Sequence, residues 1–169
     1  DGDRRVRTGA VRALGTYSDS AAVAALLTAL TSPDTWISVS AAEGLGRIRS
    51  ATTAQQLVAA TAASRPCALR ITAMQALQTF APSDALAAAR AIMGDGVPYC
   101  QTAARQAHWT LLDATLAPAA RRDARMADLA SNDAAVRAAA LLSVFWRERL
   151  SNRWRHPRLD VRADDARGH

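Results

Sequence analysis

The residues best suited to chemistry lie near the end of the sequence, where arginine and tryptophan alternate. The set comprises Trp146, Arg147, Arg149, Arg153, Trp154 and Arg155, preceded by Arg121, Arg122 and Arg125. Guanidinium groups pair with carboxylates and phosphates, and indole rings stack on bases or fill pockets of a partner protein. We therefore expect this set to bind an acidic protein or peptide, or a nucleic acid. The alternative is that Trp146 packs on the last helices while the arginines stay in solvent.

A second unusual feature is the pair His108 and Trp109, followed one helical turn later by Asp113. These three side chains could form the wall of a pocket in a groove. The alternative is that His108 and Trp109 fill space in the core. The packing alternative is favoured, because a single histidine without His, Cys or Glu partners at a metal-binding spacing does not predict a metal site. We expect neither a metal nor another cofactor.

Two cysteines, Cys67 and Cys100, are too few for a disulfide framework. Cys100 occupies an apolar helical position, so we expect a buried and inert thiol there. Cys67 follows Pro66 at a predicted helix start, where the helix dipole would favour a thiolate. The sequence thus predicts two separate cysteines with different environments.

Composition and the absence of motifs bound the class of protein. The chain has 169 residues with a net charge of +6, half of the residues are apolar, and arginine supplies all of the Lys+Arg total. Abundant alanine with few aromatic residues favours helices, and arginine without lysine is typical of a GC-rich bacterial coding bias. The sequence contains no phosphate loop, nucleophile elbow or zinc spacing, so we expect no enzymatic activity. It also lacks a visible signal peptide and a long apolar run, so we expect a cytoplasmic protein without membrane insertion.

The strongest signal is an internal repeat of about 31 to 36 residues. Similar helical runs begin at Val6, Ile37, Leu69, Cys100 and Val136. The fifth position of every run is alanine, namely Ala10, Ala41, Ala73, Ala104 and Ala140. A small residue among apolar neighbours on one helical face indicates close approach of helices. Second helices are predicted at 20–30, 52–63, 83–93 and 119–130, with Asp34 and Asp133 at helix starts.

The register of the repeats identifies one residue at a repeat edge. Trp36 aligns with Arg5 and falls in the opening turn of a predicted helix, after Pro33 and Asp34. We expect its indole to pack on the preceding turn and to remain partly exposed.

The first two repeats resemble HEAT-like repeats, particularly the short type of phycobilin-lyase-related proteins. The resemblance rests on Asp3, Val6, Ala10 and Leu14-Gly15 in the first repeat, and on Asp34, Ile37, Ala41 and Leu45-Gly46 in the second. It implies a right-handed stack of helix pairs, with one layer convex and the other lining a concave face. The expected fold class is all-α, an α-solenoid of about four and a half HEAT-like helix-pair repeats.

This resemblance also sets the expected domains. Residues 1–150 form the repeat domain, and residues 151–169 form a basic C-terminal tail. The first helix would expose an apolar flank of Val6, Ala10 and Leu14, so we expect the domain to lack an N-terminal part.

The function implied is a non-enzymatic scaffold or adaptor that binds another protein or peptide through an extended helical surface with a basic end. Two alternatives remain open. One is a nucleic-acid-binding protein related in fold to the alkylpurine DNA glycosylases. The other is a chromophore-handling protein related to bilin lyases.

Overall fold

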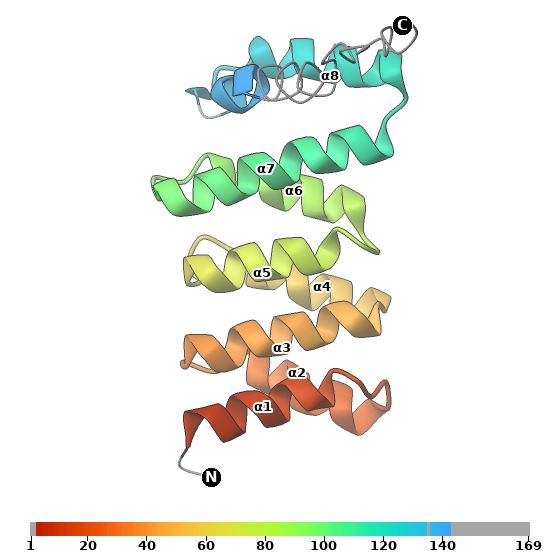
Figure 1. Cartoon of the computed structure of the whole chain (residues 1–169), viewed down its shortest axis with the longest axis vertical. Helices are drawn as coiled ribbons and strands as arrows, with labels where there is room; N and C mark the ends of the chain where they lie inside the picture. Colours follow the sequence, from red (N-terminus) through yellow and green to blue (C-terminus); the bar gives the residue numbers. More distant parts are fainter. Residues whose placement is uncertain (1–2, 135, 143–169) are drawn as a thin grey trace, which may run out of the picture.

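The computed structural model describes residues 3–134 and 136–142, and these residues form an all-α stack of helix pairs (Figure 1). Within this part of the chain the helices are α1 (Arg4–Leu14), α2 (Ser20–Leu30), α3 (Thr35–Ile48), α4 (Ala51–Ala60), α5 (Cys67–Leu77), α6 (Pro82–Met93), α7 (Pro98–Thr115) and α8 (Pro118–Leu129). Residues 136–142 are helical as well. Four pairs and the start of a fifth therefore make an α-solenoid of about four and a half HEAT-like repeats, as the sequence predicts.

Local sequence explains where most helices begin. Asp3, Asp19 and Asp34 are the N-caps of the first three helices, and each carboxylate accepts a hydrogen bond from a backbone N–H of the first turn. Ser50 and Thr53 form a reciprocal capping box at the start of α4. In α6, α7 and α8 a proline occupies the first turn, where its missing N–H costs no helical hydrogen bond. The second helix of each pair consequently begins within one residue of its predicted position.

The recurring alanine marks the buried side of the first helix of each pair. Ala41, Ala73, Ala104 and Ala140 are fully buried, which confirms the packing prediction for four repeats. Ala10 is exposed, because no described helix packs on the outer side of α1. Val6 is exposed beside it, whereas Leu14 is half-buried against the core.

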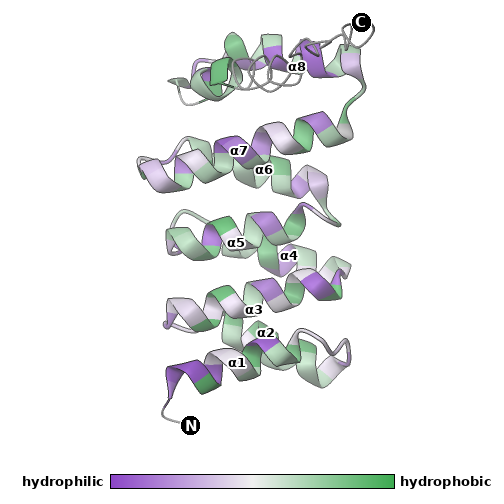
Figure 2. Ribbon diagram, in the orientation of Figure 1, coloured by the Kyte–Doolittle hydropathy of each residue, from purple (hydrophilic) through white to green (hydrophobic). Residues whose placement is uncertain are grey.

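Two layers of helices follow the chain order. The helices α1, α3, α5 and α7 form one layer, and α2, α4 and α6 lie behind them (Figure 1). Figure 2 shows hydrophobic and hydrophilic residues on every helix, with a strongly hydrophilic first turn in α1. The hydrophobic faces meet in two buried clusters that both contact Leu86. Each pair thus buries its apolar face only because its neighbours stack upon it.

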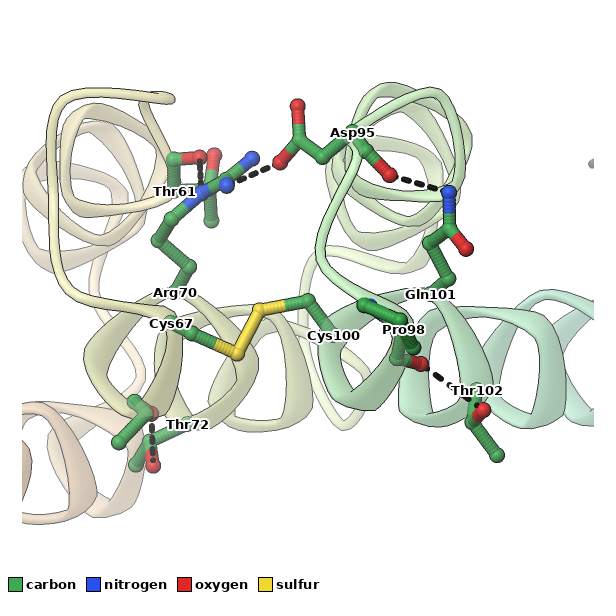
Figure 3. The surroundings of a disulfide bond; sticks show 10 residues. Thr61, Cys67, Arg70, Thr72, Asp95, Pro98, Cys100, Gln101 and Thr102 are labelled. Carbon is green, nitrogen blue, oxygen red and sulfur yellow. Dashed lines mark hydrogen bonds and ion pairs between the residues drawn. A yellow bond between two sulfur atoms is a disulfide. The ribbon is translucent and has the colours of Figure 1, made fainter.

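A disulfide bond between Cys67 and Cys100 joins the first turns of α5 and α7 (Figure 3). Their Cα atoms lie 5.9 Å apart, which is within the range that a disulfide spans. The prediction of an inert thiol at Cys100 and of a separate thiol at Cys67 is therefore wrong. The two residues are one repeat apart, so stacking brings together helix starts that are 33 residues apart in the sequence.

Polar contacts reinforce the same junction. The Arg70 guanidinium is buried, donates from Nε to the Thr61 carbonyl oxygen at 2.9 Å, and forms an ion pair with Asp95. The Gln101 side-chain amide donates to the backbone carbonyl of Asp95 (Figure 3). The ion pair thus holds the loop between α6 and α7 to α5, next to the disulfide that joins α5 to α7.

Membrane insertion was not expected from the sequence. In the described ranges, no helix combines the length and the apolar character that crossing a membrane requires.

Candidate functional site

The sequence-predicted residues of α7 and α8 meet where α6, α7 and α8 pack together. His108, on α7, is completely buried, and its Nε2 lies 2.7 Å from Oδ2 of Asp128 on α8. The other carboxylate oxygen of Asp128 lies 3.8 Å from the guanidinium of Arg90 on α6. One buried carboxylate therefore links three helices through a histidine and an arginine.

Burial is the main influence on the pKa of His108. Loss of water around the ring lowers the pKa of His108 below its ordinary value of 6.5, and the charge of Arg90 lowers it further. The hydrogen bond to Asp128 and the negative charge of that carboxylate act in the opposite direction, but burial dominates. A neutral ring that donates from Nε2 to the carboxylate leaves Nδ1 as an acceptor, and Nδ1 has no hydrogen-bond partner among the described residues.

Trp109 anchors a second set of contacts beside this pair. Its side chain is only 8% exposed, and the Arg125 guanidinium lies over the indole, 4.8 Å from the ring centroid. Arg125 also donates to Oδ1 of Asp113 at 2.9 Å, and the Arg121 guanidinium approaches the same oxygen at 3.9 Å. The His108 and Trp109 rings meet edge to face with centroids 5.2 Å apart. The contacts of Trp109 and Asp113 thus hold α8 against α7.

The predicted site residues fall into four groups. His108 and Trp109 are buried, and Asp113, Arg121 and Arg125 form one charged cluster beside Trp109. Arg122 points away from the cluster, with 78% of its side chain exposed, and contacts Asp123 at 3.6 Å. The remaining predicted residues lie outside the described part of the chain, namely Trp146, Arg147, Arg149, Arg153, Trp154 and Arg155.

Sequence reasoning missed Asp128 and Arg90. His108 and Asp128 are 20 residues apart on different helices, so no local spacing pairs them. The one available signal was His108 itself, because a buried histidine requires a polar partner on a neighbouring helix. The sequence does not say which residue that partner is.

The geometry suits a structural junction. The buried imidazole faces a carboxylate instead of solvent, and each charged group of the cluster has an opposite charge within 4 Å. Among the residues that the structure places, no group of three His, Cys, Asp or Glu side chains could hold a metal ion. The α6–α7–α8 contacts can therefore fix the shape of the surface that the last repeats present.

The comparison with protein families agrees with the stacked pairs. A family model described as HEAT repeats matches residues 1–66, which contain α1 to α4. Over its first four helices the chain is therefore similar to HEAT-repeat proteins. The match specifies HEAT repeats in general, and not the phycobilin-lyase type. No curated protein matches the chain.

Repeat register explains why α7 differs from the matched repeats. Leu14 ends α1 and Gly15 caps it, and Leu45-Gly46 lies in the last turn of α3. His108 and Trp109 take the equivalent repeat positions in α7, but they lie inside this helix, which continues to Thr115. Glycine there permits close approach of the next helix, as at Gly46 and Ala76. In α7 these positions instead carry two buried rings, and α8 contacts them through Asp128 and Arg125.

Proposed function

We propose that this HEAT-like repeat protein is a non-enzymatic scaffold that binds another protein or peptide along its helical stack. HEAT repeats generally serve as protein-interaction scaffolds. The observation that carries the proposal is the continuous stack itself, in which buried alanines and glycine contacts hold successive helices in register. A rigid surface loses little conformational entropy when it binds, so many weak contacts can add to a useful affinity.

The basic end of the chain is the proposed contact region for a partner of acidic character. Arg121 and Arg125 are engaged with Asp113, so their first role is to hold α8 in place. Arg122 and Met126 are exposed one helical turn apart on α8 and offer a cation and a flexible apolar side chain. The segment from Trp146 to Arg155 supplies the remaining arginine and tryptophan residues of the proposed region.

The disulfide supports an oxidising compartment as the place of function. Disulfides persist in extracellular and periplasmic proteins and are rare in a reducing cytosol. The bond between Cys67 and Cys100 therefore speaks against the cytoplasmic location expected from the sequence.

The proposal is tested by affinity capture with purified protein as bait. We expect wild-type protein to retain one or more specific proteins, and a variant with Arg122→Glu, Arg147→Glu and Arg149→Glu to lose them. Arg49→Glu is the matched control, because Arg49 is an exposed arginine at the end of α3, far along the stack from α8. Equal retention by the triple variant would contradict the basic end as the contact region.

A second measurement, the binding of duplex DNA at different salt concentrations, distinguishes the nucleic-acid alternative from the scaffold proposal. Binding of duplex DNA that weakens steeply with salt, together with no captured protein, would replace the scaffold proposal.

A further inference from the structure

The first helices of successive pairs all begin along one edge of the stack. In Figure 1 the first residues of α1, α3, α5 and α7 lie on the left side, with the connections from α2, α4 and α6. We call this side the N-terminal edge and define it by Arg4, Arg5, Arg7, Trp36, Arg65 and Tyr99. None of these residues belongs to the α6–α7–α8 junction.

Two large aromatic side chains project from equivalent positions on this edge. Trp36 is the second residue of α3 and is 62% exposed, and Tyr99 is the second residue of α7 and is 72% exposed. The equivalent residue of α5 is Ala68, whose small side chain leaves the surface between Trp36 and Tyr99 low. Isolated exposed apolar residues are common, but two rings in the same register of a repeat form an ordered pair of contact points.

At the end of the edge near Trp36, the carboxylate of Asp34 contacts both α1 and α3. Asp34 Oδ1 accepts the backbone N–H of Trp36 at 3.0 Å, which sets the start of α3. Asp34 Oδ2 faces the guanidinium groups of Arg4 and Arg7 at 3.7 and 3.9 Å. Both arginine side chains remain substantially exposed, and the carboxylate of Asp3, the N-cap of α1, lies in the same turn. Arg5 is another exposed cation in this turn, so Arg4, Arg5 and Arg7 against Asp3 and Asp34 leave one net positive charge at this end of the edge.

The spacing of the edge matches an extended chain. Packed helices lie about 8–10 Å apart, so two steps from α3 to α7 separate the Trp36 and Tyr99 positions by roughly 16–20 Å. An extended or polyproline II segment covers that distance with about five or six residues. Arg65, exposed before α5, lies between the two aromatic positions along the edge. Cations and aromatic rings therefore alternate from α1 to α7.

We propose that the N-terminal edge binds an extended acidic segment of a partner protein, with carboxylates on the arginines and proline rings on Trp36 and Tyr99. Arginine pairs with carboxylates through charge-assisted hydrogen bonds, and exposed aromatic rings are the usual platforms for proline-rich segments. Tryptophan, tyrosine and arginine are also the residues that dominate binding energy at protein interfaces. This inference rests on the proposed scaffold function and assigns it a surface separate from the basic C-terminal end.

The test is fluorescence anisotropy with labelled ten-residue probes on the full chain. We expect a peptide of alternating glutamate and proline to bind at least tenfold more tightly than one of alternating lysine and proline. Trp36→Ala should weaken binding of the acidic peptide about tenfold, and Arg4→Glu with Arg7→Glu should weaken it at least as much. Higher salt should reduce the affinity, because the arginines are exposed.

Tyr17→Ala is the matched control. Tyr17 is another exposed aromatic residue, but it follows α1 at the opposite edge of the stack, so its removal should leave the affinity unchanged. Equal binding of the two peptides, or unchanged affinity in the Trp36 and arginine variants, would overturn the proposal. Tighter binding of a ten-nucleotide single-stranded oligothymidylate than of the acidic peptide would also overturn it.

These results can be distinguished from failure of the scaffold proposal. If captured proteins are lost with the Arg122, Arg147 and Arg149 substitutions but retained after Trp36→Ala, the scaffold function stands and the edge proposal fails. If the acidic peptide binds the edge, a negative result at the C-terminal end leaves the edge proposal intact.

Discussion

Gly46 of α3 faces Ala76 of α5 at a distance that leaves no room for a side chain. A Cβ atom added to Gly46 would lie 2.6 Å from the Cβ of Ala76, and one added to Gly15 would lie 2.5 Å from the Cα of Gly44. Neither neighbour is the movable end of a long side chain, so the helix backbones themselves would have to separate. The two seams between the first three repeats therefore depend on glycine.

Replacing Gly46 by alanine should destabilise the protein despite the better helix propensity of alanine. Propensity alone favours the substitution by about 1 kcal/mol, whereas overpacking of a tight seam costs about 1–3 kcal/mol. We expect the variant to have a lower free energy of unfolding, measured by urea denaturation with circular dichroism as the signal. Gly9→Ala is the control, because apart from its chain neighbours and its own helix backbone no described atom lies within 4 Å of the added Cβ, and this variant should gain up to about 1 kcal/mol. Equal stabilisation by both substitutions would contradict the seam.

Reduction of the disulfide should lower the thermal stability of the repeats. Closing a loop between residues 33 apart stabilises a protein by about 3–4 kcal/mol in the chain-entropy model. For a chain of this length that corresponds to a fall in Tm of roughly 6–15 °C. The measurement is a melting curve with and without dithiothreitol.

The matched control for reduction removes both sulfur atoms. A variant with Cys67→Ala and Cys100→Ala should melt near the temperature of the reduced wild-type protein and should not respond to dithiothreitol. Two free thiols in the unreduced wild-type protein, measured by thiol titration in denaturant, would refute the bond.

Stability should fall as the pH is lowered through the histidine range. Burial lowers the pKa of His108 in the folded protein below 6.5, so the unfolded chain takes up a proton more readily than the folded one. The contribution of neutral His108 to the free energy of unfolding is therefore fully present above about pH 6.5. It is lost progressively as the pH falls toward the lower pKa of the folded protein. Urea unfolding between pH 7.5 and 5 measures this slope.

His108→Gln isolates the effect of that imidazole. The glutamine amide can still donate to Asp128, but it does not titrate, so we expect a flatter dependence of stability on pH. A slope identical to that of the wild-type protein would show that other groups cause the loss.

Arg125 should contribute more to stability than its neighbour Arg122. The Arg125 side chain is 15% exposed, lies over Trp109 and bonds to Asp113, whereas Arg122 extends into solvent. We expect Arg125→Gln to cost about 1–2 kcal/mol and Arg122→Gln less than about 0.5 kcal/mol. Denaturant unfolding gives both values, and equal costs would contradict the packing of α8 on Trp109.

The periodic features of this protein could be predicted because they are local. Helix starts follow from Asp19, Asp34 and the prolines, which act within one turn. Alanine at the same place in every repeat identifies the packing face, because helical periodicity puts Ala41 on the side of Ile37 and Leu45. The exposure of Trp36 also follows from the register.

The candidate site could be predicted only in part. His108, Trp109 and Asp113 stood out as departures from the repeat, but their partners Asp128 and Arg125 come from α8. Which residue of one helix meets which residue of another depends on the angle and offset of packing, and a single sequence does not encode these in any local pattern.

The sequence by itself determined that the chain folds into paired helices and which face of each helix is buried, because capping and helical periodicity act between residues a few positions apart. Only the tertiary structure decided that Cys67 forms a disulfide with Cys100 and that the buried His108 side chain forms a hydrogen bond with Asp128. Both contacts join residues brought together by stacking, and their geometry exists only once the repeats have packed.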